Sequence, residues 1–124
     1  AEMIPLPEAQ DAAERALRFL LDEHDLVRAG YPADHKPHPL WRRLNFPLFY
    51  QTDILFVLRV LDEWWALDHP NAKRALDWLA GQQGKNGRWR GASPFRTRTY
   101  AGVSPPEETG RWVTLQAARL VGAP

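Results

Sequence analysis

The chain alternates between stretches in which apolar residues follow a helical spacing and long stretches that are polar or rich in proline and glycine. Apolar residues at positions i, i+3, i+4 and i+7 form one face of an amphipathic helix. This pattern predicts four helices: one over about residues 8–25, one over 52–67, one that follows residue 68 and stops at 81, and one from 107 or 109 to 121. Strand-like alternation is confined to residues 96–100. We therefore predict an all-α protein with two long loops.

The second predicted helix differs from the others because it is apolar almost all round. From residue 54 to residue 67, only Arg59, Asp62 and Glu63 interrupt its apolar residues. A helix without a polar face is buried on several sides. We therefore expect residues 52–67 to lie in an inner layer that other helices cover.

Residues in the flanking turns predict where the later helices begin and end. Asp68 is the predicted N-cap of the third helix, and Pro70 fits in its first turn. That helix is expected to stop at the glycine-rich turn 81–87. Ser104 and Glu107 have the spacing of a capping box before the fourth helix.

Two pairs of similar segments indicate an internal repeat. The segment 16–20, ALRFL, is similar to 75–79, ALDWL, which lies 59 residues later. Leu55 in the second helix similarly matches Leu115 in the fourth, 60 residues later. Helices one and three are therefore predicted to be equivalent, and so are helices two and four.

The repeat predicts a unit of two helices, a helix hairpin, that occurs twice in one domain covering residues 1–124. The first unit spans about residues 8–67 and the second about 68–121. Two such units leave an apolar face uncovered, because each repeat buries its core against neighbouring repeats. We therefore expect either further repeats N-terminal to these two or self-association of the chain.

Composition narrows the classes of function. The 124 residues are 44% hydrophobic and 25% charged, as in soluble globular domains. The net charge of +1 gives no reason to expect a nucleic-acid partner, and no apolar run is long enough to span a membrane. With no cysteine, disulfides and thiolate ligands are excluded. We expect a soluble protein without a cofactor, and a cytoplasmic location is favoured.

His35 and His38 are close enough in sequence to be considered as metal ligands, but the neighbouring residues argue against a metal site. Pro37 and Pro39 prevent His35 and His38 from pairing on one face of a helix. No further ligand stands at a recognisable spacing from them. We predict no metal site.

A glutamine, a glycine and a tryptophan follow the third helix as Gln83-x3-Gly87-x-Trp89. This arrangement resembles the QW motif of terpenoid cyclases and protein prenyltransferases. Two further segments resemble inner helices of bacterial proteins with squalene-cyclase or prenyltransferase repeats: 44–55, LNFPLFYQTDIL, and 109–115, TGRWVTL. Together these segments extend over about two thirds of the chain.

The resemblance implies an α/α toroid, in which two concentric rings of helices surround a cavity. A complete ring contains more helix pairs than two, so the chain looks like the C-terminal portion of such a toroid. The resemblance gives Gln83, Gly87 and Trp89 a structural role, in which the glutamine amide bonds backbone groups at a neighbouring helix end and the indole stacks on it. The Asp-x-Asp-Asp motif of cyclases that protonate their substrate is absent, and so is the cysteine that ligates zinc in prenyltransferases.

Five aromatic residues near the inner helices are candidates for lining an apolar cavity, and core packing is the alternative for each of them. They are Trp41, Phe46, Phe49, Tyr50 and Trp112.

Two candidates concern charge. Asp53, at the start of the second helix, is a weak candidate for a catalytic acid with a raised pKa. Its alternative role is to stabilise the helix N-terminus. Arg96 and Arg98 are candidates for binding an anion, because guanidinium groups suit phosphate. The alternative is a solvated loop.

From these patterns we expect a toroid segment that lines an apolar cavity for an isoprenoid or other lipid-like small molecule, without self-sufficient catalysis. A structural or protein-interaction module of helical repeats is one alternative. The wall of a catalytic toroid whose acid lies upstream is another.

Overall fold

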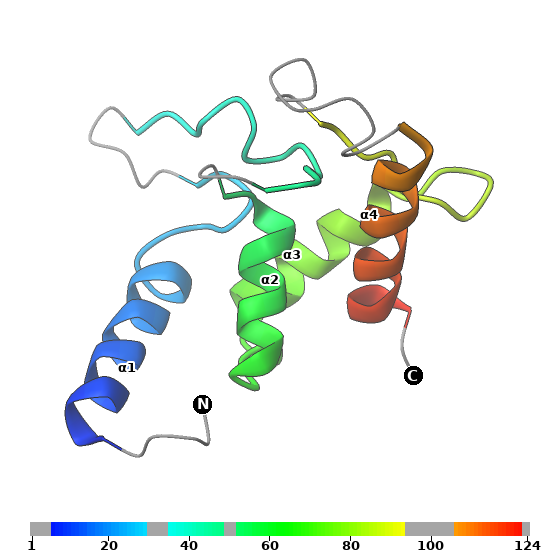
Figure 1. Cartoon of the computed structure of the whole chain (residues 1–124). Helices are drawn as coiled ribbons and strands as arrows, with labels where there is room; N and C mark the ends of the chain where they lie inside the picture. The colour runs from blue at the N-terminus through cyan, green and yellow to red at the C-terminus, as the bar shows by residue number, and fades with distance from the viewer. Residues whose placement is uncertain (1–5, 30–34, 49–51, 94–105, 123–124) are drawn as a thin grey trace.

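Four α-helices make up most of the described chain (Figure 1). They are α1 (Pro7–Leu21), α2 (Ile54–Glu63), α3 (Pro70–Gly81) and α4 (Pro106–Val121). The structure, a computed structural model, describes residues 6–29, 35–48, 52–93 and 106–122. These ranges contain no strand, only an isolated parallel bridge between Asn45 and Ala92. The prediction of an all-α protein with four helices is confirmed.

Two helices are shorter than predicted, because the residues after them adopt other conformations. α1 ends at Leu21 rather than residue 25. The Asp25 Oδ1 atom accepts hydrogen bonds of 2.8 and 2.9 Å from two following backbone N–H groups, and so begins a separate turn. α2 ends at Glu63 rather than residue 67. Trp65 has a φ angle of 52°, which a right-handed helix does not contain.

The N-cap of α3 is His69, not the predicted Asp68. The His69 Nδ1 atom accepts a hydrogen bond of 3.1 Å from the Asn71 backbone N–H. Pro70 occupies the first turn of α3, where its missing N–H costs no helical hydrogen bond. The imidazole of His69 thus takes the capping role that the carboxylate of Asp68 was expected to have.

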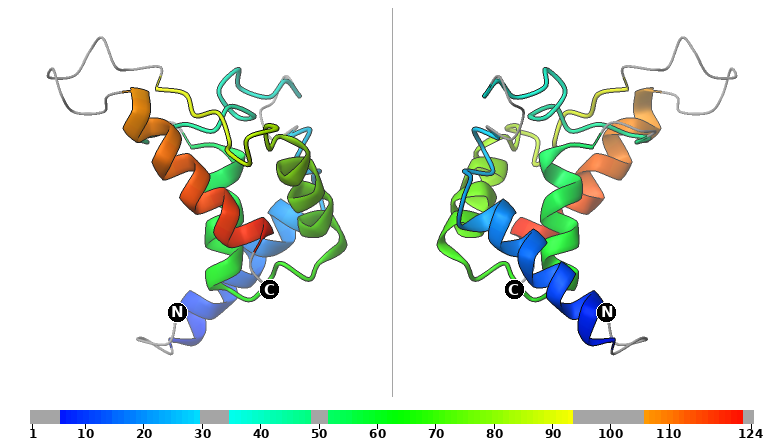
Figure 2. Two further views of the ribbon diagram at one scale, coloured as in Figure 1. Left: turned by 90° about the vertical axis from the view of Figure 1, so that its right-hand side faces the viewer. Right: turned by 90° about the vertical axis from the view of Figure 1, so that its left-hand side faces the viewer.

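α2, α3 and α4 form a three-helix core in which each helix packs against both others (Figures 1 and 2). α2 contributes five buried residues: Ile54, Leu55, Val57, Leu58 and Leu61. The buried apolar residues of the other two helices are Ala72, Ala75, Leu79, Val113 and Ala117. α2 is therefore surrounded on several sides, as its apolar sequence predicts. None of the described helices is both long and apolar enough to cross a membrane.

α1 lies apart from this core. Its N-terminal end extends beyond the other helices in both views of Figure 2, and only Leu21 at its C-terminal end is buried. In α3 the repeat counterparts Ala75 and Leu79 are fully buried, whereas Ala16 in α1 is exposed and Leu20 is half-buried. The apolar stripe that α3 buries is thus only partly buried in α1, where Leu17 and Leu20 pack against the core and remain half-exposed.

The C-terminal end of α1 is fastened to the start of α3 by polar contacts. Asp22 pairs with the His69 Nε2 atom at 2.9 Å, and Asp25 pairs with Arg74 at 2.6 Å. Asn71 also donates its side-chain N–H to the Leu21 carbonyl. α1 is therefore anchored at one end, while its first three turns make few contacts.

Burial does not follow the predicted match between the inner helices. Leu55 is 1% exposed, but its expected counterpart Leu115 is 50% exposed. The buried residues instead match at a separation of 56: Val57 with Val113, and the position of residue 61 with residue 117. α4 differs from α2 because only one of its faces, which includes Val113 and Ala117, is buried among the described residues.

Two loop segments cover one end of the core. Residues 41–46 and 89–92 run side by side, joined by backbone hydrogen bonds from Phe46 N to Ala92 O (2.8 Å) and from Ala92 N to Leu44 O (2.7 Å). In Figure 1 the segment 35–48 lies over the upper ends of the helices. Together the segments 41–46 and 89–92 form a layer of loops at this end of the core, which we call the loop layer.

Leu58→Asp tests the position of α2. The Leu58 side chain is fully buried, so the variant places a carboxylate without a partner in the core. We expect a loss of at least about 5 kcal/mol, comparable with the whole stability of a small domain, and therefore a chain without a cooperative unfolding transition. Circular dichroism during urea titration measures this.

The matched control is Phe56→Asp, because Phe56 lies on the same helix but is 41% exposed. It should keep the helical signal and most of the stability. A folded Leu58→Asp protein of near-normal stability would show that the inner position of α2 is wrong.

Candidate functional site

A groove of about 210 Å³ runs between α2 and α4. Its lining residues come from both helices: Arg59, Asp62, Glu63, Trp112, Leu115, Gln116, Arg119 and Leu120. Trp112 is 46% exposed and Leu115 50% exposed, and Phe56 lies exposed on the adjoining surface of α2. Because α3 packs against both helices from the other side, this groove lies on the face of the α2–α4 pair that no described helix covers.

Trp112 is positioned by an aromatic partner from the loop layer. The rings of Phe46 and Trp112 are stacked, with centroids 5.5 Å apart and an interplanar angle of 23°. Two aromatic residues predicted to line a cavity are thus brought together, although they are far apart in sequence. Of the two stacked residues, Trp112 lines the groove and Phe46 does not.

Trp41, another of the residues predicted to line a cavity, does not line this groove. Trp41 is buried, and its Nε1 atom donates a hydrogen bond of 2.7 Å to the Leu26 carbonyl. Trp41 therefore belongs to the core beneath the loop layer. Phe49 and Tyr50 lie outside the described residues.

Asp53 is a fully buried N-cap of α2. Its Oδ1 atom accepts a hydrogen bond of 2.8 Å from Phe56 N. Its Oδ2 atom accepts two from Asn45, at 2.8 Å from the backbone N and at 3.0 Å from Nδ2. Both oxygens are therefore occupied, and the side chain has no exposed surface. This geometry favours the stabilising role over that of a catalytic acid.

Burial raises the pKa of the Asp53 carboxyl above its usual value. Hydrogen bonds from Phe56 and Asn45 act in the opposite direction, but the loss of hydration outweighs them. The carboxyl is therefore perturbed by its structural position.

Asn45 is a hydrogen-bonding partner of Asp53 that the sequence pattern did not predict. Its Nδ2 atom donates to the carbonyl of Leu40 at 2.9 Å as well as to Asp53, and its Oδ1 atom is buried without a partner among the described atoms. The side chain thus ties the loop layer to the start of α2. In the sequence, the only sign of this role is that a polar residue, Asn45, directly precedes Phe46 and Pro47.

Gln83, Gly87 and Trp89 form a closed turn after α3. The Gln83 Nε2 atom donates to the Gly87 carbonyl at 2.9 Å, and Gly87 has a φ angle of 78°, which favours glycine. The buried Trp89 donates from Nε1 to the Leu79 carbonyl at 2.7 Å. The indole, rather than the glutamine amide as expected, therefore satisfies the helix end.

Trp89 also joins this turn to α4. Its backbone N–H donates to the Thr114 hydroxyl at 3.0 Å, and the hydroxyl lies 3.2 Å from the Trp89 carbonyl, to which it donates. The turn is therefore bonded to both α3 and α4.

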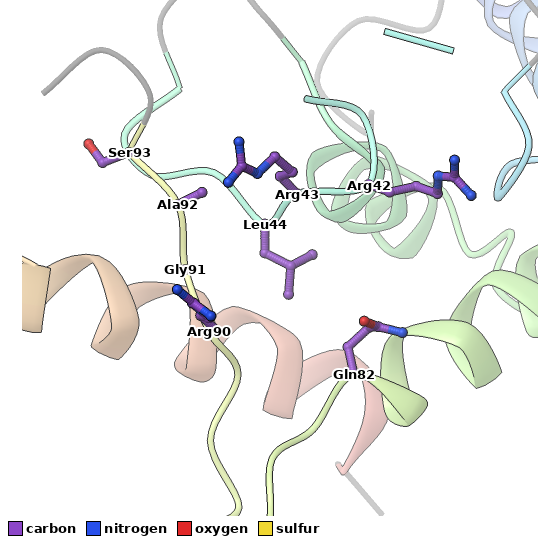
Figure 3. Close-up of a pocket in the computed structure, with 8 residues that line it drawn as sticks. All are labelled: Arg42, Arg43, Leu44, Gln82, Arg90, Gly91, Ala92 and Ser93. Atoms are coloured by element: carbon purple, nitrogen blue, oxygen red, sulfur yellow. The ribbon is translucent and has the colours of Figure 1, made fainter. Parts of the chain in front are cut away.

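Three arginines line a pocket of about 370 Å³ in the loop layer (Figure 3). The predicted anion-binding residues Arg96 and Arg98 lie outside the described residues. Arg90, from the same segment of sequence, lines this pocket together with Arg42 and Arg43. In the described parts of the chain, no three histidine, aspartate or glutamate side chains cluster so as to hold a metal ion.

No protein-family model, curated protein or solved structure matches this chain. A function therefore has to be inferred from the geometry of the residues.

The raised pKa of Asp53 predicts a pH-dependent contribution to stability. In the unfolded chain the Asp53 carboxyl releases its proton near pH 3.8, as an ordinary aspartate does, whereas in the folded chain it does so at a higher pH. Between these values the folded state binds more protons, so the contribution is largest below pH 3.8 and is lost as pH rises through the folded pKa.

We therefore expect the free energy of unfolding of the wild type, relative to Asp53→Asn, to increase as pH falls from neutrality to about 4. The comparison cancels titration at other sites, because both proteins share them. Urea unfolding of the two proteins across this pH range measures the difference. A difference that is constant with pH would contradict the raised pKa.

Proposed function

We propose that the chain is a segment of an α/α-helical ring and that its α2–α4 groove binds the apolar chain of an isoprenoid or other lipid-like molecule. The observation that carries the proposal is the exposure of Phe56, Trp112 and Leu115 on the one face of the inner helices that α3 does not cover. Large apolar side chains that gather on one surface mark a binding site.

The polar residues of the groove suit an amphiphile better than a plain hydrocarbon. Arg59 from α2 and Arg119 from α4 line it together with Trp112 and Leu115. A lipid-like ligand would place its apolar chain against the aromatic and leucine side chains. Its polar or anionic group would then lie beside a guanidinium.

Asp53 does not supply an acid to this groove. The groove residues do not include it, and backbone and amide N–H groups occupy its carboxylate oxygens. The proposed function is therefore binding, without a catalytic residue from this chain.

The proposal predicts that Trp112→Ala weakens binding of farnesol, an isoprenoid alcohol, by about tenfold or more. The indole is the largest apolar surface of the groove, and a tenfold change corresponds to about 1.4 kcal/mol. Equilibrium dialysis with radiolabelled farnesol measures the dissociation constant for the wild type and the variant.

Trp65→Ala is the matched control. Trp65 is 73% exposed but does not line the groove, so its removal should leave the affinity unchanged. Absence of farnesol binding by the wild type, or equal weakening by both variants, would contradict the proposed groove.

The incompletely buried stripe of α1 favours a second candidate function, in which the chain is a module that packs against other helices. The equivalent stripe of α3 is buried by α2 and α4, whereas Leu17 and Leu20 of α1 are only half-buried. A second copy of the chain can cover this stripe with the open side of α4, where Leu115 is exposed.

This candidate predicts an oligomer of the 14.2 kDa chain that Leu17→Asp dissociates. A charge on the stripe would disfavour burial of the α1 face. Arg15→Asp, at an exposed position on the same helix but outside the stripe, should leave the oligomer intact. Native mass spectrometry distinguishes these species, and a wild-type monomer would contradict self-association.

A further inference from the structure

The arginine pocket is built from two segments that the loop layer holds side by side. Residues 42–44 form one wall, residues 90–93 form the other, and Gln82 closes the pocket at the end of α3 (Figure 3). The backbone hydrogen bond from Ala92 N to Leu44 O, at 2.7 Å, joins the two walls directly. The pocket is thus a product of the fold, because its arginines are nearly fifty residues apart in sequence.

The backbone of the second wall is fixed against α4. A Cβ atom added to Gly91 would lie 2.8 Å from Thr109 Cγ2 and 3.0 Å from the Thr109 carbonyl oxygen. This spacing excludes a side chain, so glycine allows the segment to pack directly on the helix. Leu44 in the opposite wall is buried as well. The arginines therefore extend from a rigid frame.

The pocket carries positive charge that no acidic residue of its described lining neutralises. Arg42, Arg43 and Arg90 contribute three guanidinium groups, and the lining residues that the structure describes include no acid. None of the three forms an ion pair with an acid in the described ranges, where the ion pairs are those of His69 and Arg74. The α2–α4 groove differs, because Asp62 and Glu63 line it together with its arginines.

The remaining polar groups are suited to an oxyanion. Each guanidinium presents five N–H donors in a planar fork that matches a phosphate group. The Gln82 amide and the Ser93 hydroxyl add neutral donors to the lining.

The arginines are spread along the pocket rather than gathered at one point. In Figure 3 the Arg43 and Arg90 side chains lie on the Ser93 side of Leu44, and Arg42 lies on the opposite side. A ligand with several anionic groups can contact both sides, whereas a single phosphate contacts one. The geometry points to a binding site for a small molecule that carries more than one phosphate group. Among the described residues this site shares no lining residue with the α2–α4 groove, and the inference does not depend on that groove.

The test is isothermal titration of the full chain with inorganic tripolyphosphate at low ionic strength. We expect one site per chain, with affinity that falls as salt is added. Orthophosphate should bind at least tenfold more weakly, because it reaches fewer guanidinium groups. Arg43→Gln and Arg90→Gln should each weaken tripolyphosphate binding about tenfold or more, since each removes a charged donor.

Arg88→Gln is the control, because Arg88 is exposed in the neighbouring turn but does not line the pocket. It should bind tripolyphosphate like the wild type. The three substituted arginines are exposed, and circular dichroism of each variant verifies that its fold is unchanged.

Equal binding of orthophosphate and tripolyphosphate would contradict a site for more than one phosphate group. Three further results would overturn the inference. The first is no binding by the wild type at low ionic strength, and the second is weakening by Arg88→Gln equal to that of the pocket variants. The third is tighter binding of a single-stranded oligonucleotide than of tripolyphosphate, lost in Arg43→Gln and Arg90→Gln. That result would assign the same arginines to a nucleic-acid backbone rather than to a small ligand.

Discussion

The hydrogen bonds between Asp53 and Asn45 hold the helical core and the loop layer together. Asp53 caps α2 with one oxygen and accepts both N–H groups of Asn45 with the other. The backbone next to Asn45 then pairs with Ala92, which brings the two walls of the arginine pocket into register. A single buried carboxylate, kept in place against the cost of lost hydration, therefore fixes the start of the inner helix and the layer above it.

Periodicity predicts the helices well, because helix formation depends on residues three and four positions apart. It predicts the buried character of α2 for the same reason. It does not predict the end of α1, since a side-chain bond from Asp25 competes with the helical backbone there. Sequence similarity between the repeats does not predict burial either. Leu55 and Leu115 are the same residue type, but only Leu55 is buried.

The candidate sites were predictable only where one stretch of sequence supplies the chemistry. The acidic N-terminus of the second helix pointed to Asp53, and the aromatic ring of Trp112 made it a candidate for binding. Asn45 and the grouping of Arg42 with Arg90 depend on which loops pair, and that pairing is set by long-range backbone hydrogen bonds. Arg96 and Arg98 led to the prediction of an anion site in the loop before α4. In the described pocket, however, Arg42 and Arg43 come from the loop before α2.

The attachment of α1 at one end gives the molecule two levels of stability. Asp22 and Asp25 hold the C-terminal end of α1 to α3, while most of the helix has few buried apolar contacts. Local opening costs less free energy where buried contacts are few. We therefore expect α1 to be a subglobal unfolding unit, whose amide protons exchange with solvent through a detachment that leaves the α2–α3–α4 core folded.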